Sequence, residues 1–208
     1  MTNLPPGKVT QVIAAITGLA FALAWVSGLQ QQLALVAGFI PARAGGLLIL
    51  EGALPAWLTP LSATLVHAGL LHLGFNLLLF VYVGRHVESV IGGMPSLILY
   101  VAGAYAAALL HWAISPGETV PMVGASGAIS ATFGAYAVFF SRSRTEGLGP
   151  LSPFAVRVLW LASAWIFIQS LIGMASMGGR VAIFAHIGGF VIGLALARPL
   201  LLWRYRRA

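Results

Sequence analysis

Repeated apolar stretches of about 20 residues constrain this chain more than any other feature. At 1.5 Å per residue, a helix of that length covers the roughly 30 Å of hydrocarbon in a bilayer. Of the 208 residues, 60% are hydrophobic and only 7% are charged, too few charges for the surface of a soluble globular protein. Because backbone groups in lipid must be bonded internally, the stretches are expected to be helical. The sequence therefore predicts an all-α polytopic membrane protein, with residues 1–208 forming a single membrane domain.

Polar or Gly/Pro-rich joints separate six predicted spans. A long connection, residues 29–68, lies between the first two and is too apolar for an ordinary aqueous loop. We expect it to lie partly embedded in the membrane interface. A second span that opens near Gly69 leaves Thr59 to Ala68 in that connection. The predicted spans cover residues 9–28, 69–85, 95–114, 122–141, 154–174 and 181–202.

Basic residues orient the chain, because cytoplasmic loops carry an excess of Lys and Arg. Placing both termini in the cytoplasm leaves only Arg43 and Arg180 outside and predicts a short basic cytoplasmic tail at residues 203–208. Basic residues at segment ends favour a lipid bilayer as partner over nucleic acid. Without an Arg- and Ser-rich transit segment, we expect a prokaryotic plasma (inner) membrane. The nine basic residues then inside are Lys8, Arg85, Arg142, Arg144, Arg157, Arg198, Arg204, Arg206 and Arg207.

Missing residue types exclude several chemistries. The chain has no Cys, so disulfides, thiol catalysis and thiolate metal sites are excluded. It has no Asp, which excludes an intramembrane aspartyl protease, and no His-Glu-x-x-His, which excludes the zinc type. We expect neither a metal nor another cofactor.

One serine, Ser126 in Gly-Ala-Ser-Gly, stands near the head of the fourth predicted span. A helix N-terminus offers free amides and a partial positive charge, which suit an oxyanion formed beside a nucleophilic serine. Taken alone, the motif is better explained by helix packing, since strings of small residues line helix interfaces in membranes.

His186, in Ala-His-Ile-Gly-Gly, changes that balance because a titratable side chain within a span is costly and usually functional. Ser126 and His186 each lie about five residues into spans that descend from the outside, so they are expected at the same depth. Gly189 and Gly193 form a GxxxG pattern that permits close helix approach. No carboxylate is expected at that depth, so the sequence favours a Ser-His dyad. The alternative for His186 is a structural histidine bonded to a backbone carbonyl.

His72 and Asn76 are four residues apart, on one face of the second span. Two such donors aimed at the bundle interior can stabilise a developing oxyanion. The alternative is a polar clasp between helices.

Taken together, these three places resemble the rhomboid family of intramembrane serine proteases, over roughly residues 55–200. The resemblance implies a six-helix bundle with Ser126 as nucleophile and His186 as general base. It assigns the oxyanion hole to His72, Asn76 and the backbone of Ser126. His67 also matches a family histidine, for which a structural role is expected.

The chain departs from the family pattern at two places. Rhomboids commonly carry an aromatic one turn after the nucleophile that stacks on the catalytic histidine, where this chain has Ser130. The Trp-Arg pair of the first external connection is also missing, since Trp57 is followed by Leu58.

The expected function is hydrolysis of a peptide bond in or near the outer end of transmembrane helices, in single-span or polytopic membrane protein substrates. The active site would open to the outer side of the membrane. The alternative is a non-proteolytic rhomboid-like protein that binds or chaperones transmembrane segments. A transporter is a weaker third possibility, because the polar residues cluster near one face.

Overall fold

The computed structural model describes residues 4–140, 147–177 and 182–206, with the backbone alone for residues 172–177. Within these residues there is no β-strand, and the all-α class is confirmed. In chain order the elements are α1 (Lys8–Ser27), α2 (Gln30–Ala37), α3 (Pro41–Ala44), α4 (Thr59–Ser62), the 3-10 turn η1 (Ala63–Leu65), α5 (Leu70–Ile91), α6 (Gly93–Ile114), α7 (Ser126–Phe139), α8 (Pro153–Met177) and α9 (Ile183–Tyr205).

Six of these helices lie at the positions of the six predicted spans. Among the described residues, five helices are long and apolar enough to cross a membrane: α1, α5, α6, α8 and α9. The sixth, α7, has 14 residues, a length of about 21 Å at 1.5 Å per residue. A membrane protein with several spanning helices is therefore supported, and the number of six crossings stays a prediction.

The two largest differences from the predicted bounds are at the start of α7 and the end of α5. Helix α7 begins at Ser126 rather than near residue 122, because Gly124 has a φ of +108° that an α-helix cannot contain. Ser126 is thus the first helical residue and not the fifth. Helix α5 continues past Arg85 to Ile91, because the polar Glu88 is buried inside the bundle instead of ending the span.

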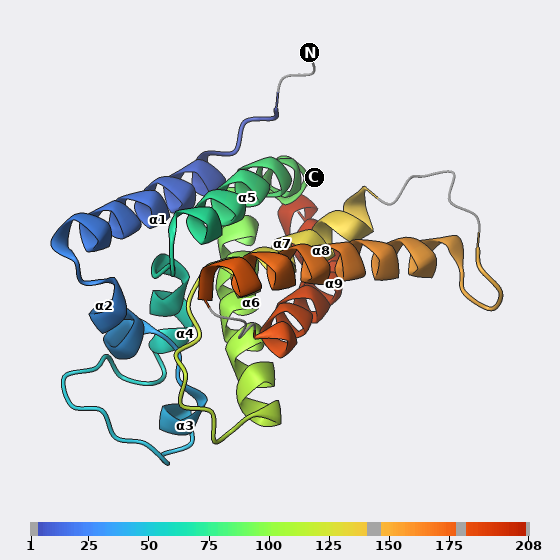
Figure 1. Ribbon diagram of the computed structural model, residues 1–208. Helices are drawn as coiled ribbons and strands as arrows, with labels where there is room; N and C mark the ends of the chain where they lie inside the picture. Colours follow the sequence, from blue (N-terminus) through green and yellow to red (C-terminus); the bar gives the residue numbers. More distant parts are fainter. Residues whose placement is uncertain (1–3, 141–146, 178–181, 207–208) are drawn as a thin grey trace.

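Helices α7 and α9 lie side by side and run in the same direction (Figure 1). A Cβ built on Gly189 would overlap the carbonyl oxygen of Gly127, and one built on Gly193 would overlap that of Ala131. The GxxxG pattern therefore brings the two backbones into direct contact, as small residues do in membrane helix pairs.

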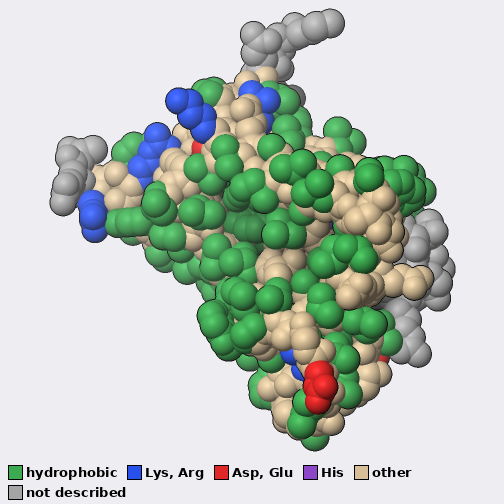
Figure 2. All heavy atoms as spheres, turned by 90° about the vertical axis from the view of Figure 1, so that its left-hand side faces the viewer, with side chains coloured by type: hydrophobic (Ala, Val, Ile, Leu, Met, Phe, Trp, Pro, Cys, Tyr) green, Lys and Arg blue, Asp and Glu red, His purple; other side chains and the backbone are tan. Residues whose placement is uncertain are grey.

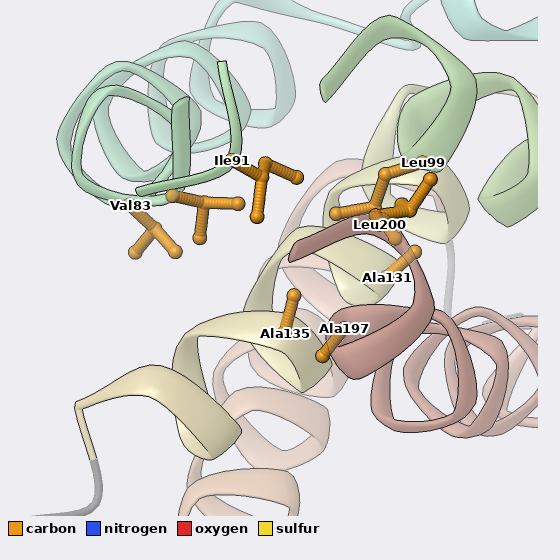
Figure 3. Packing of buried hydrophobic residues seen from close by; sticks show 8 residues of the cluster. Val83, Ile91, Leu99, Ala131, Ala135, Ala197 and Leu200 are labelled. Carbon is orange, nitrogen blue, oxygen red and sulfur yellow. The ribbon is translucent and has the colours of Figure 1, made fainter. Parts of the chain in front are cut away.

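A buried cluster further along these helices adds α5 and α6 to the pair (Figure 3). Because the second half of α5 packs there against the second halves of α7 and α9, these three helices share one direction. The cluster consists of Val83, Val87, Ile91, Leu99, Ala131, Ala135, Ala197 and Leu200.

The connection between α1 and α5 contains the short elements α2, α3, α4 and η1, which Figure 1 shows below α1. Its long loop exposes large apolar side chains, among them Leu47, Ile49 and Trp57, which are 70%, 88% and 70% exposed. One face of the molecule is mostly hydrophobic, with Lys and Arg gathered mainly toward one end (Figure 2). Partial embedding of the connection stays a prediction.

The start of α1 is fixed to the end of α5 by Glu88. Its carboxylate accepts hydrogen bonds from the backbone N–H of Val9 at 3.0 Å and of Thr10 at 2.8 Å. The hydroxyl of Thr10 donates to the same carboxylate at 2.7 Å. An acidic group suits this place because a helix N-terminus has unpaired amides and a partial positive charge. These contacts give Glu88 a structural role at the junction of α1 and α5.

We predict that Glu88→Ala destabilises the folded protein by about 1 to 3 kcal/mol, because buried donors at the start of α1 lose their acceptor. Thermal unfolding in detergent would measure the effect. The matched control is Glu51→Ala, which removes an exposed carboxylate and should change stability by less than about 0.5 kcal/mol. Equal unfolding temperatures for the two variants would contradict the capping role.

Candidate active site

Ser126 is held at the head of α7 by the loop before it. The N–H of Gly124 donates to the carbonyl of Ala63 at 2.9 Å. A Cβ built on Gly124 would lie 2.6 Å from Cε1 of His72, so only glycine lets the loop pass this close to α5. The positive φ at this position is one that glycine adopts without steric cost. The loop thus turns sharply into α7 and leaves the first amides of the helix without intrahelical acceptors.

His186 lies opposite Ser126, across the contact between α7 and α9. Its Nε2 is 2.9 Å from Oγ of Ser126, within hydrogen-bonding distance. The two side chains are 4% and 8% exposed. Within the described part of the chain, Nδ1 of His186 has no hydrogen-bond partner. The pair therefore stands without a carboxylate bonded to the imidazole in that part of the chain.

His72 and Asn76 are both buried on α5, and both face the loop before Ser126. Nε2 of His72 lies 2.7 Å, and Nδ2 of Asn76 3.7 Å, from a Cβ built on Gly124. Oδ1 of Asn76 accepts a hydrogen bond from the amide of Gln169 at 3.1 Å. Nδ2 of Asn76 and Nδ1 of His72 have no partner among the described residues. Asn76 thus accepts an interhelical hydrogen bond through Oδ1, while its Nδ2 group remains available as a donor.

His67 lies beside these residues, in the turn between η1 and α5. Its Nε2 accepts a hydrogen bond from the N–H of Ala125 at 3.4 Å, and its ring centroid is 5.0 Å from that of His72. Burial, and then the nearby His72, lower the pKa of His67 to about 3, so the ring is neutral at physiological pH. A neutral acceptor bonded to the residue before Ser126 agrees with the expected structural role.

A cavity of about 460 Å³ opens beside Ser126, His186 and His72. Small residues of α6 and α7 line it next to the serine: Ala104, Ala107, Gly127 and Ala128. Polar groups lie elsewhere on its wall, among them His111, Ser115 and Glu118. The cavity can therefore take a chain segment with a small side chain near Oγ of Ser126.

Three residues around this site were not predicted to take part in it. The indole N–H of Trp165 donates to Oγ of Ser130 at 2.6 Å, and that hydroxyl donates to the carbonyl of Ser126 at 2.7 Å. Gln169, one turn beyond Trp165, bonds Asn76. The sequence did hold a signal for Gln169, because an amide within an otherwise apolar span needs a polar partner.

Other residues lie at the margin of the site, outside it, or outside the described chain. His86 contacts the aromatic rings of α5 and α7, and His111 lies near the end of α6, on the cavity wall. Trp57 lies exposed in the long connection. Outside the described residues are Arg142, Arg144, Arg180 and Arg207.

Sequence comparisons place the chain among rhomboid proteins. It is 28% identical over 195 residues to the rhomboid protease GlpG of Pectobacterium atrosepticum, which covers 92% of this chain and 62% of that protein. It is 31% identical over 137 residues to the rhomboid protease GlpG of Serratia proteamaculans, covering 65% of this chain and 45% of the relative. For the protein of the same name from Yersinia pestis the identity is 29% over the same coverage.

The chain thus matches less than two thirds of the length of each of these relatives. A sequence model of the Rhomboid domain matches residues 55–203, well over half of the chain. That range contains Ser126, His186, His72 and Asn76, together with the helices that bring them to one cavity. The chain therefore belongs to the rhomboid family.

Proposed function

We propose that this protein is an intramembrane serine endopeptidase that works with a dyad of Ser126 and His186. The observation that carries the proposal is the 2.9 Å distance between Oγ of Ser126 and Nε2 of His186 beside a cavity in an apolar helix bundle. Serine is a weak nucleophile until a base removes its proton, and imidazole is the usual base. Membership in a family whose relatives are named proteases supports the same activity.

In the proposed reaction, Nε2 of His186 takes the hydroxyl proton while Oγ of Ser126 attacks the carbonyl carbon of the scissile bond. The resulting tetrahedral intermediate collapses, and the imidazolium donates that proton to the leaving amine. A water molecule, deprotonated by the same imidazole, then hydrolyses the acyl-enzyme ester and restores the serine. In this scheme Nδ1 of His186, which has no hydrogen-bond partner among the described residues, keeps the ring's other proton, so two residues suffice to balance the proton transfers.

The oxyanion of that intermediate would be stabilised by the backbone N–H of Ser126 and by the side chains of His72 and Asn76. Ser126 begins α7, so its amide has no acceptor within the helix. Nδ2 of Asn76 has no partner in the described residues and lies close to the loop before Ser126. Donors fixed before the reaction stabilise the charge without reorganisation in the transition state.

Substrates would be single-span or polytopic membrane proteins, bound with part of a transmembrane helix unwound in the cavity. Alanines and glycines line the cavity beside the serine, which favours a small side chain at the cleaved bond. A helix must lose its internal hydrogen bonds before its carbonyl can be attacked, so helix-breaking residues near that bond are expected.

The protein would sit in a prokaryotic plasma membrane with both termini cytoplasmic and the cavity opening to the outer side. Exposed basic residues lie at the start of α1 and the end of α9, among them Lys8, Arg204 and Arg206. Arg204 donates to the backbone of Ser89 at the end of α5, so these helix ends meet at one end of the bundle. The positive-inside tendency favours that end for the cytoplasm.

We predict that Ser126→Ala and His186→Ala each abolish cleavage of a single-span model substrate by the purified protein in detergent. Since the two residues act as a unit, the double variant should be scarcely slower than either single variant. A fluorophosphonate should modify Ser126 in the wild type. Ser96→Ala is the matched control, because among the described residues Oγ of Ser96 bonds only the backbone of Gly92.

Retained cleavage by Ser126→Ala would overturn the proposed function. A wild-type protein that binds the substrate but neither cuts it nor reacts with the fluorophosphonate would instead support the non-proteolytic rhomboid-like alternative.

We predict that Asn76→Ala lowers kcat with little change in KM, because a donor used mainly in the transition state acts on the rate. The expected loss is about 2 to 4 kcal/mol of transition-state stabilisation. Steady-state cleavage kinetics would measure it, with Gln31→Ala as an exposed amide control. An unchanged kcat with a raised KM would assign Asn76 to helix packing alone.

For the topology, we predict that a cysteine at position 206 resists an impermeant thiol reagent in intact cells and reacts after permeabilisation. A cysteine at position 51, in the exposed loop of the first connection, should react in both cases. The native chain has no cysteine, so each variant reports one site. Reaction at position 206 in intact cells would reverse the proposed orientation.

A further inference from the structure

We propose that α8 carries two positioning residues for the dyad site: Trp165, which is linked to Ser126 through Ser130 and lies beside the ring of His186, and Gln169, which orients the amide of Asn76. This inference rests on the proposed function. It is carried by two buried polar contacts that reach the site from a helix without any of the predicted site residues.

Trp165 is fixed on three sides. Its indole N–H donates to Oγ of Ser130 at 2.6 Å, and its ring stacks on Phe133 with a centroid distance of 4.2 Å. Its ring and that of His186 lie edge to face, with a centroid distance of 6.4 Å and an interplanar angle of 71°. The side chain is only 1% exposed. A rigid aromatic wall therefore limits the rotation of the imidazole, although no residue of α7 stacks on it at position 130.

Ser130 connects the indole to the nucleophile. Its hydroxyl accepts from Trp165 and donates to the carbonyl of Ser126 at 2.7 Å. A phenylalanine at position 130 would remove this hydroxyl and both of its hydrogen bonds. The serine at that place and the tryptophan on α8 thus form one arrangement, in which the aromatic group comes from a neighbouring helix.

Gln169 acts on the other half of the site. Gln169 and Asn76 are 4% and 0% exposed, and the glutamine amide donates to Oδ1 of Asn76 at 3.1 Å. Because that oxygen is occupied, the Nδ2 group is turned away from Gln169. Nδ2 is the atom without a described partner, near the loop before Ser126. The bond therefore selects the amide orientation that an oxyanion donor requires.

Trp165 and Gln169 are four residues apart, so they lie on the same face of α8. None of the other residues of Pro153–Leu171 is buried, and large side chains such as Leu159, Trp160 and Phe167 lie on the surface. Within this part of α8, the contacts with the site are thus concentrated at one pair of residues. When this face of α8 packs against the bundle, it positions the proposed base, His186, and the proposed oxyanion donor, Asn76, together.

The kinetic test compares Trp165→Phe, which removes the N–H and keeps a ring, with Gln169→Met, which keeps the length and removes the amide. Each should lower kcat roughly tenfold while KM changes less than about twofold, as expected for lost supporting contacts. Gln169→Met should add little to Asn76→Ala, and Trp165→Phe little to Ser130→Ala, because each pair shares one contact. Ser130→Ala also tests the indole contact if Trp165→Phe does not fold.

Trp160→Phe and Ser170→Ala are the matched controls on α8. Trp160 is 68% exposed, and the hydroxyl of Ser170 donates to the backbone carbonyl of Ile166 in its own helix. Both should retain the wild-type kcat. If Gln169→Met or Trp165→Phe folds and has the kcat of the controls, the positioning role of that residue is overturned. If the wild type itself does not cleave the substrate, the proposed function is overturned instead.

A second readout does not depend on proteolysis. The chain has only two asparagines, Asn3 and Asn76, so asparagine-selective 15N labelling gives two side-chain amide signals, and Asn3→Ala leaves one. In the wild type and in Ser170→Ala, the side-chain amide of Asn76 should be rigid and its hydrogens should exchange slowly with solvent. In Gln169→Met the same amide should be mobile. An equally rigid signal in Gln169→Met would overturn the orienting bond.

Discussion

The site depends on the direct backbone contact between α7 and α9. Helices in lipid gain no hydrophobic energy from association, so they are held by close packing and by hydrogen bonds. Gly189 and Gly193 have no side chains to hold the axes of α7 and α9 apart. Their backbone lies so close to α7 that a Cβ at either position would overlap a carbonyl oxygen. This places His186, one turn before Gly189, opposite the first residue of α7. Any side chain at these glycines would separate the serine from the imidazole.

A second constraint is the turn into α7. Gly124 passes so close to His72 that a Cβ there would overlap the ring, and its positive φ prevents the helix from starting earlier. The neutral His67 bonds the amide of Ala125 on the other side of the turn. Two histidines and a glycine thus hold the loop, and Ser126 emerges from it with unpaired helix amides beside it. The same turn makes α7 short.

The polar groups of the bundle form two separate sets. Near the cavity, Trp165, Gln169 and Ser130 bond other buried polar side chains or the carbonyl of Ser126. At the opposite end, Glu88 bonds the start of α1 and Arg204 bonds the end of α5. Unpaired polar groups are costly in a low dielectric, and each bond offsets part of that cost. Nδ2 of Asn76, which has no partner among the described residues, lies near the place proposed for the substrate oxyanion.

The sequence by itself determined the helical class, the positions of the long helices, and the identity of Ser126, His186, His72 and Asn76 as the polar residues of interest. The helices and the polar positions follow from local properties: apolar length, the cost of titratable groups in lipid, and spacing along one helix face. The choice of Ser126 among the serines rests also on the resemblance to the rhomboid family. Only the tertiary structure decided that α7 starts at Ser126, that α5 continues past Glu88, and that Trp165 and Gln169 reach the site. A helix end depends on which loop can turn, and a buried polar partner on which helix lies opposite. Both are set by contacts between residues far apart in the chain, for which apolar periodicity gives no signal.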